Sequence, residues 1–241
     1  MHPTTRSLTY AAMSTHPDIA YITQFLSQSN KNPNQQDWKA GKRVLRYLKG
    51  TKDIGIVYRR DPEPWRTGQD HVMPWGYCDV NYAKDSHDWK LTSEYGFMLA
   101  NGPIAWKSKK QPSIALSTTE AKYYALGMAC QEGIWLKQLC QEIFMTLDKS
   151  NNVFSDNTSA VTLSDNPVFH NISKHISIHW HFIGDLIHSK TVHSSHIPGI
   201  QNGAAFLTKA VNRFKHKWCM KLLGIVRGWP LFCSKAISEF C

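Results

Sequence analysis

The sequence has few carboxylates and no long apolar run. Lys and Arg number 28 and Asp and Glu number 18 among 241 residues, which gives a formal net charge of +10 at pH 7. No apolar stretch approaches the roughly 18 residues that a membrane-spanning helix needs. The first ten residues, MHPTTRSLTY, lack the apolar segment of a secretory signal. We therefore expect an intracellular protein, cytoplasmic or nuclear, with a polyanionic partner and no membrane partner.

Closely spaced cysteines are also missing. The six Cys residues are far apart and form no C-x-x-C pair, which argues against a zinc ribbon and against a thioredoxin-like site. We expect free thiols in a reducing compartment. The chain contains 42% hydrophobic and 12% aromatic residues. This content is enough for a buried core and excludes a mostly disordered basic tail.

The first sixty residues are predicted to be mostly helical. Apolar periodicity indicates helices over residues 16–26 and 35–48, and Gly50 is expected to cap the second. A short strand is predicted at 54–58. The following stretch DPEPWRTGQD, with two Pro and one Gly, is typical of a linker, so we place a domain boundary near residue 68. The residues of the second helix expected to share a buried stripe are Trp38, Val44, Leu45 and Leu48.

From residue 68 the pattern changes to mixed α/β. Strands are predicted at 75–80, 95–99, 104–108, 152–155 and 192–197, with a hairpin turn at Asn101-Gly102. A capping-box pattern from Ser117 to Glu120 opens a long helix, and further helices are expected after Asp156, at 176–187 and at 206–223. This order predicts a mixed sheet flanked by helices. The apolar stripe of the long helix is expected at Tyr124, Met128, Trp135, Leu139 and Ile143.

Three acids occupy unusual positions in this pattern. Asp79 lies inside an apolar strand, Glu120 lies in the first turn of the long helix, and Asp156 lies between a strand and the next helix. If these positions converge, the carboxylates repel one another unless hard cations neutralise them. Such oxygen-rich sites suit Mg²⁺ or Mn²⁺, and two such ions about 4 Å apart can activate water against a phosphodiester.

Each acid also has a purely structural interpretation. Glu120 is the residue that a capping box requires, and Asp156 is a favourable helix N-cap. Asp79 is harder to explain in this way, because Asp is disfavoured inside strands. Spacing alone does not prove that the three acids converge.

Several blocks in the chain resemble the ribonuclease H domain at the end of copia-type retrotransposon polyproteins. They run in order over roughly residues 68 to 223. Two upstream blocks resemble the tail of the reverse transcriptase that precedes this domain. The ribonuclease H blocks are GYCDVNYAKD, GPIAWKSKKQPSIALSTTEAKYYAL, VFSDNTSAV, NPVFHNISKHISIHWHFI and AAFLTK, and the upstream blocks are SLTYAAMSTHPDIAYITQFLSQ and DWKAGKRVLRYLKGTKDIGIVY.

The resemblance implies a ribonuclease H-like mixed five-stranded sheet flanked by helices, preceded by a small, mostly helical reverse transcriptase tail. It implies three segments: a reverse transcriptase remnant at 1–67, a ribonuclease H-like domain at 68–223 and an unassigned tail at 224–241. It also places catalytic and metal-binding roles on Asp79, Glu120 and Asp156. The implied activity is Mg²⁺- or Mn²⁺-dependent hydrolysis of the RNA strand of an RNA:DNA hybrid.

The sequence departs from the family pattern at one metal-binding position. The fourth acid of the family falls on Ala205, and after Asp185 the next carboxylate is Glu239. Asn81 and Ser177 also stand where the family often has aspartates. We therefore expect strongly impaired cleavage. The chain also has no two adjacent Asp, as a polymerase site requires, so DNA synthesis would need the rest of a reverse transcriptase as a partner.

Basic residues near the acids are candidates for holding phosphates. They could neutralise a hybrid of any sequence, or they could simply form a solvated surface. His175 and His179, four residues apart, could hold a transition metal if they lie on a helix, but no acid or Cys lies at ligand spacing. Trp106 and Trp135 are expected in the core. The predicted nucleic-acid-binding residues are Lys107, Lys109, Lys110, Lys174 and His175.

Three interpretations remain open from the sequence. The first is a weakened ribonuclease H, and the second is a protein that only binds nucleic acid. The third is a non-functional element fragment whose fold is incomplete.

Overall fold

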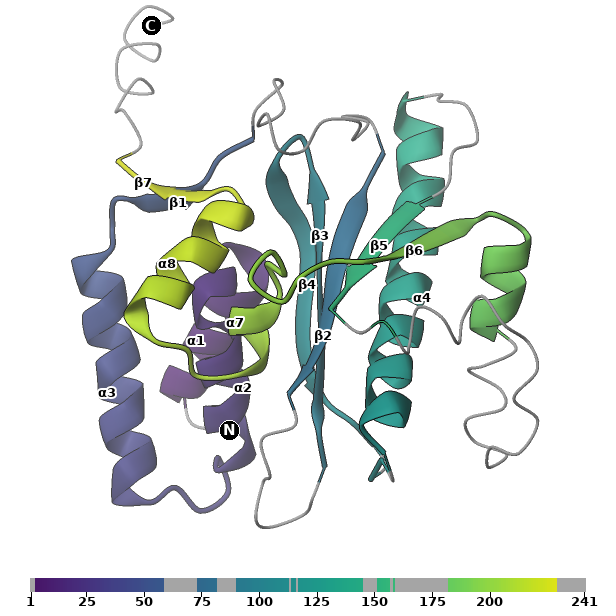
Figure 1. The fold of residues 1–241 in the computed structure, drawn as a ribbon. Coiled ribbons are helices and arrows are strands. Elements are labelled where there is room, and N and C mark those ends of the chain that lie inside the picture. Colours follow the sequence, from purple (N-terminus) through teal and green to yellow (C-terminus); the bar gives the residue numbers. More distant parts are fainter. Residues whose placement is uncertain are drawn as a thin grey trace, which may run out of the picture.

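A five-stranded mixed sheet forms the centre of the molecule (Figure 1). The computed structural model describes residues 3–58, 73–81, 90–112, 114–115, 117–144, 151–156, 158 and 182–228. The strand order is β4-β3-β2-β5-β6, in which β2, β3 and β4 are antiparallel neighbours and β5 and β6 add in parallel. The strands are β2 (Trp75–Asn81), β3 (Thr92–Leu99), β4 (Gly102–Lys110), β5 (Asn151–Ser155) and β6 (Val192–His196).

Helices cover both faces of this sheet (Figure 1). The long helix α4 (Thr118–Phe144) and the helical residues 182–188 pack on one face, around Phe97, Leu126 and Val153. The short helices α7 (Ala205–Thr208) and α8 (Arg213–Leu222) pack on the other face. The predicted mixed five-stranded sheet flanked by helices is therefore confirmed.

The turn between β3 and β4 lies one residue earlier than predicted. Ala100 and Asn101, with φ of 48° and 63°, form the two-residue loop, and Gly102 is already the first residue of β4. Tight hairpin loops of this length favour positive φ at both central residues, and Asn adopts this conformation readily. Gly102 is required for a different reason, because a Cβ there would lie 2.5 Å from the Tyr58 ring.

The buried stripe of α4 combines small and large residues. Ala121, Ala125 and Ala129 are at most 1% exposed, and Tyr123 and Leu126 are buried with them. Of the stripe predicted from the sequence, Met128 packs against this core, but Trp135 is 55% and Ile143 61% exposed. Trp135 is therefore not a core residue. Trp106 does pack against the apolar cluster beneath α7, and its Nε1 donates to Ala12 O at 2.7 Å.

Helices also form the N-terminal part of the chain: α1 (Pro3–Ser14), the 3₁₀ turn η1 (Pro17–Ile19), α2 (Ala20–Gln28) and α3 (Gln35–Gly50). Asn34 and Asp37 form a complete capping box at the start of α3. The helix continues through Gly50, so Thr51 is its C-cap and the prediction for Gly50 was wrong. Of the stripe predicted for α3, Val44 is buried, but Trp38 and Leu45 are about half exposed.

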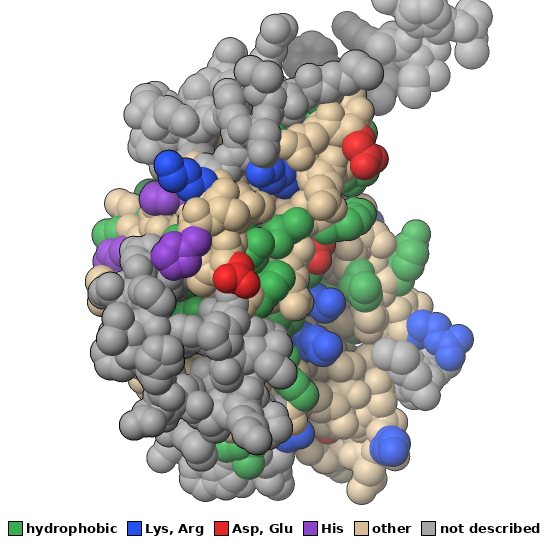
Figure 2. Space-filling model, turned by 90° about the vertical axis from the view of Figure 1, so that its right-hand side faces the viewer, with side chains coloured by type: hydrophobic (Ala, Val, Ile, Leu, Met, Phe, Trp, Pro, Cys, Tyr) green, Lys and Arg blue, Asp and Glu red, His purple; other side chains and the backbone are tan. Residues whose placement is uncertain are grey.

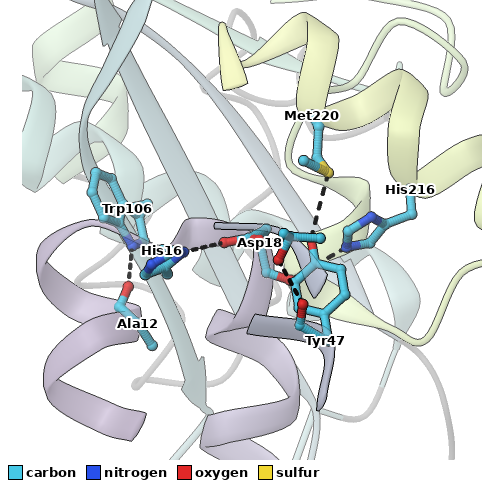
Figure 3. A network of polar contacts seen from close by, with 8 residues as sticks. Ala12, His16, Asp18, Tyr47, Trp106, His216 and Met220 are labelled. Atoms are coloured by element: carbon cyan, nitrogen blue, oxygen red, sulfur yellow. Dashed lines mark hydrogen bonds and ion pairs between the residues drawn. The ribbon is translucent and has the colours of Figure 1, made fainter. Parts of the chain in front are cut away.

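Polar contacts join the N-terminal helices to one another and to α8 (Figure 3). Tyr47 Oη donates to Asp18 Oδ2 at 2.7 Å, and a ring nitrogen of His216 lies 3.3 Å from Asp18 O. Beyond the sheet, β1 (Ile54–Ile56) pairs antiparallel with β7 (Ile225–Arg227). The start of the C-terminal stretch that the sequence left unassigned thus forms a strand. In the described part of the chain, no helix combines the length and the apolar character that crossing a membrane requires.

Candidate functional site at the ends of two parallel strands

Asp79 is a buried carboxylate near the end of β2. Its side chain shares one face of the strand with Trp75 and Tyr77, whereas Cys78 and Val80 face α4. Asp79 is 6% exposed, and the Val80 N–H donates to its Oδ1 at 2.7 Å. A single backbone donor compensates only part of the cost of burying a carboxylate, so other groups must stabilise the charge.

Asp156 lies beside Asp79 because the two strands run in parallel. Cys78 pairs with Ser155, and each acid follows directly after its paired residue. Residues 197–203 turn back toward Asp156, and a Cβ placed on Gly199 would lie 3.4 Å from its Oδ2. Burial, followed by the charge of Asp156, raises the pKa of Asp79 to about 6. The structure therefore brings together two of the three predicted acids.

Two lysines act on this carboxylate pair. Lys122 Nζ, from the start of α4, lies 3.3 Å from Asp156 Oδ1, with the two side chains 29% and 25% exposed. Lys209, which follows α7, and Lys122 both oppose the rise in the pKa of Asp79. The resulting centre contains two carboxylates and two ammonium groups, which come from four different segments of the chain.

Glu120, the third predicted acid, lies in the first turn of α4. Its backbone N–H donates to Ser117 Oγ at 3.0 Å, as the capping pattern predicted, and the residue is partly exposed. The carboxylate whose charge raises the pKa of Asp79 is that of Asp156. The α4 residue that contacts the pair is Lys122, two positions further along. The catalytic role of Glu120 stays a prediction.

Glu94 is a further acid on the same face of the sheet. It is the register partner of Asp79 on β3, and its own partner on β4, Ser108, donates to its Oε1 at 2.8 Å. Glu94 is 1% exposed, and its Oε2 has no hydrogen-bond partner in the described structure. Burial raises the pKa of Glu94 well above its ordinary value, despite the Ser108 hydrogen bond.

Ala205, where the resemblance implies a fourth acid, is the first residue of α7. It is 3% exposed and lies in the apolar cluster that includes Tyr77 and Leu207. The preceding turn is fixed by Asn202, whose Nδ2 donates to Cys78 O at 3.0 Å. α7 therefore presents a methyl group at its start and the Lys209 cation at its end.

The predicted nucleic-acid-binding residues that the structure describes lie on both faces of β4. Lys107 and Lys109 are exposed on β4, where strand alternation places them on the face opposite Ser108 and Glu94. Lys110 is on the Glu94 face, and its Nζ donates to Gln28 Oε1 at 3.1 Å. Figure 2 shows basic, acidic and His side chains close together on one face, in place of a uniformly basic surface. Lys174 and His175 lie outside the described residues, as do His179 and Ser177.

The carboxylates provide few ligands for a metal. Asp79 and Asp156 are the two predicted acids that the structure places together, and oxygen donors of this kind suit Mg²⁺ or Mn²⁺. Within the described ranges, no group of three or more His, Cys, Asp or Glu residues is arranged to hold a metal ion. The approach of Lys122 to Asp156 further reduces the oxygens that a cation could use.

The sequence reasoning did not identify Glu94, Lys122 or Lys209. Glu94 directly precedes the strand predicted at 95–99, so the argument that identified Asp79 did not reach it, whereas the structure begins β3 at Thr92 and places Glu94 inside the strand. The two lysines carry no comparable signal. A Lys near a helix start or after a short helix is common on protein surfaces, and only the tertiary structure places these two beside the acids.

Comparison with known proteins places the chain among transposon polyproteins. It is 36% identical over 219 residues to the retrovirus-related Pol polyprotein from transposon TNT 1-94 of Nicotiana tabacum, which covers 91% of this chain and 16% of that protein. Identity to the corresponding polyprotein from transposon RE2 of Arabidopsis thaliana is 34% over 224 residues, covering 93% of this chain and 15% of that protein. The chain thus spans about one sixth of the length of these relatives.

Further similarities cover parts of the chain. Secreted RxLR effector protein 161 of Plasmopara viticola is 39% identical over 130 residues, which is 54% of this chain and 86% of that protein. Among solved structures, LC11-RNase H1 in complex with an RNA/DNA hybrid matches with a TM-score of 0.39 and 15% identity, over 54% of this chain and 88% of that chain. No protein-family model matches. Because the Pol relatives match almost the whole sequence, the chain belongs to the retrovirus-related Pol polyproteins of copia-type transposons.

Proposed function

We propose that this chain is the ribonuclease H-like part of a Pol polyprotein, that it binds RNA:DNA hybrids, and that its hydrolysis of the RNA strand is strongly impaired. The observation that carries the proposal is the pairing of Asp79 and Asp156 at the ends of the adjacent parallel strands β2 and β5. Buried acids beside basic groups suit a protein that must hold phosphates around a small acidic centre. The formal net charge of +10 supports a polyanionic ligand.

The nucleic-acid backbone would be held by charge and not by base contacts. Lys107 and Lys109 are exposed on the edge strand β4, where a phosphate can approach without displacing packed side chains. Contacts of this kind do not depend on base sequence, and their affinity falls steeply with salt concentration. We include Lys174 and His175 as further phosphate contacts on the basis of the sequence alone.

The impairment of hydrolysis follows from the set of carboxylates. Cleavage would require Mg²⁺ or Mn²⁺, for which Asp79, Asp156 and Glu120 are the candidate ligands. Two-metal hydrolysis needs several oxygen ligands around a reacting phosphate. Ala205 supplies none, and the start of α4 presents the Lys122 ammonium to Asp156. These residues fit the binding of nucleic acid better than they fit efficient metal-dependent cleavage.

The rest of a reverse transcriptase is a second proposed partner. The N-terminal helices pack on the sheet through contacts such as Trp106 to Ala12. The relatives that match this chain are whole Pol polyproteins, and the chain spans about one sixth of their length.

Hybrid binding and cleavage can be measured on the same preparation. A fluorescent RNA:DNA hybrid is titrated with the full chain at several NaCl concentrations, and anisotropy is expected to show binding that weakens as salt rises. Cleavage is then followed on a gel with 5 mM Mg²⁺ present, and it is expected to be barely above that of an Asp79→Asn variant. Binding that does not tighten on lowering the salt concentration would contradict the proposal. Rapid cleavage that depends on Asp79 would contradict the predicted impairment.

A further inference from the structure

The acidic centre already contains its own counter-ions. Asp79 and Asp156 follow paired residues of β2 and β5, Lys122 forms an ion pair with Asp156, and the charges of Lys122 and Lys209 both act on Asp79. In a metal-dependent centre, a divalent cation would take this role. We infer that Lys122 and Lys209 neutralise the Asp79–Asp156 pair in place of a divalent cation, so that the centre does not take up Mg²⁺ or Mn²⁺. This inference rests on the proposed function, and it concerns the same site.

At Asp156, Lys122 and a metal ion would compete for the same carboxylate. Lys122 Nζ is 3.3 Å from Asp156 Oδ1, within hydrogen-bonding and ion-pairing distance. A bound Mg²⁺ would have to lie about 2.1 Å from a carboxylate oxygen and keep a complete octahedral shell. An ammonium on the same carboxylate would repel that ion, and it would compete with the ion for the carboxylate oxygens. Both side chains are only about one quarter exposed, so water screens this repulsion incompletely.

The second cation comes from the opposite face of the sheet. Lys209 directly follows α7, and its charge acts on both Asp79 and Glu94. At the other end of the same short helix, Ala205 contributes only a methyl group within an apolar cluster. α7 therefore adds positive charge to the centre and no oxygen ligand.

Glu94 does not complete a ligand set with the Asp79–Asp156 pair in the described structure. Glu94 is hydrogen-bonded by Ser108 on the far side of Asp79 from β5, because the strand order is β4-β3-β2-β5. No group of three or more potential ligands forms a metal site among the residues described. The centre is thus neutral in formal charge, with two carboxylates and two ammonium groups, and it requires no added cation. Hybrid binding is accordingly expected to be insensitive to EDTA.

Titration of the full chain with MnCl₂ by isothermal titration calorimetry tests this directly. The wild type is expected to show no saturable heat, and its melting temperature should not change when Mn²⁺ is added. Lys122→Glu removes the ammonium and adds a carboxylate beside Asp156. This variant is expected to bind Mn²⁺ at least about tenfold more tightly than the wild type, a change typical of altered metal-site surroundings. Its melting temperature should be low without Mn²⁺ and recover when the ion is added.

A matched variant separates this effect from a change in net charge. Lys107→Glu makes the same substitution at an exposed position on β4, on the face opposite Glu94. It is expected to bind Mn²⁺ no better than the wild type. If Lys122→Glu does not fold, Lys122→Gln removes the ammonium with little change of shape. That variant is expected to show weak Mn²⁺ binding that is lost in the double variant Lys122→Gln/Asp79→Asn.

The inference is wrong if the wild type binds one Mn²⁺ per chain and Asp79→Asn abolishes that binding. It is also wrong if neither Lys122 variant binds Mn²⁺ better than the wild type. These outcomes are distinct from a failure of the proposed function. Hybrid binding is measured without added metal, so it can be present or absent whichever result the Mn²⁺ titration gives.

Discussion

The two faces of the central sheet differ in what they bury. On the α4 face, β2 and β3 present Cys78, Val80, Tyr95 and Phe97, and the surrounding cluster is apolar. On the opposite face the same strands present the apolar side chains of Trp75, Tyr77 and Met98, but Asp79 and its partner Glu94 are also buried there. Between β2, β3 and α4 the sheet therefore buries an apolar core that stabilises the fold, whereas the opposite face buries two carboxylates at a cost in stability.

This difference indicates where function can be built into a sheet without loss of the fold. A carboxylate at Asp79 costs free energy, and the fold reduces that cost with one backbone hydrogen bond and two nearby lysines. The apolar packing between the sheet and α4 must offset the free energy that burying these charges costs. Variants on each face should consequently shift the free energy of unfolding in opposite directions.

The largest effect is expected from Phe97→Ala on the apolar face. Phe97 is fully buried and packs edge-on against Tyr95. Removing its ring should lower the free energy of unfolding by about 3–5 kcal/mol, because a cavity forms in a closely packed cluster. Urea denaturation followed by circular dichroism measures the change. A loss below about 1 kcal/mol would mean that this face is not the main source of stability.

Asp79→Asn should raise the free energy of unfolding, in contrast to Phe97→Ala. The folded chain holds a proton on Asp79 up to about pH 6, against an ordinary pKa of 3.8, so it binds that proton more tightly than the unfolded chain does. The wild-type free energy of unfolding should therefore fall as pH rises from about 4 to about 6. The Asn variant should lack this fall and be more stable than the wild type at pH 8 by about 3 kcal/mol. Urea titrations at pH 4, 6 and 8 test the prediction, which fails if the variant is less stable at pH 8.

Glu94→Gln should change stability little at neutral pH. Burial raises the pKa of Glu94 well above its ordinary value, and an amide can still accept the Ser108 hydrogen bond. We expect a change within about 1 kcal/mol at pH 7. The variant should gain stability relative to the wild type as pH rises further, because only the wild type must then ionise a buried group. A large loss at pH 7 would show that the ionised form of Glu94 stabilises the fold.

The smallest effect on stability is expected for Lys122→Gln. The ion pair with Asp156 is partly exposed, and pairs of this kind contribute at most about 1 kcal/mol. The difference from the wild type should shrink further in 1 M NaCl, because salt screens the interaction. Thermal melts at low and high salt measure it. A loss that is large and independent of salt would assign Lys122 a packing role in place of an electrostatic one.

Much of the fold could be predicted from the sequence. The five strands, the long helix and the capping of α4 by Ser117 follow from local patterns, and the structure contains each of them. The error on α4 has a clear physical cause. Apolar residues recur at helical spacing on more than one side of α4, and the rotation of the helix against the sheet buries Ala121, Leu126 and Leu136 while Trp135 and Ile143 stay exposed. The pairing of β1 with β7 could not be predicted, because it joins three-residue segments about 170 positions apart.

The candidate site was predictable only in part. Asp79 and Asp156 were identifiable because acids are unusual inside or directly after apolar strands, and the parallel pairing of β2 with β5 places them together. The prediction for Glu120 rested on the capping pattern and on the resemblance. Helical periodicity gives the angle between Glu120 and Lys122, but not which of them faces Asp156, since that depends on how α4 is rotated against the sheet.

The sequence by itself determined the excess of positive charge, the order of strands and helices, and the membership in the Pol polyprotein family. Each of these depends on local pattern or on the residues themselves. Only the tertiary structure decided which charges meet, because Asp79, Lys122, Asp156 and Lys209 come from four segments that the folded sheet brings together. The carboxylates and lysines that a sequence counts separately become one charge-balanced centre, since electrostatic interaction depends on distance in space and not on separation along the chain.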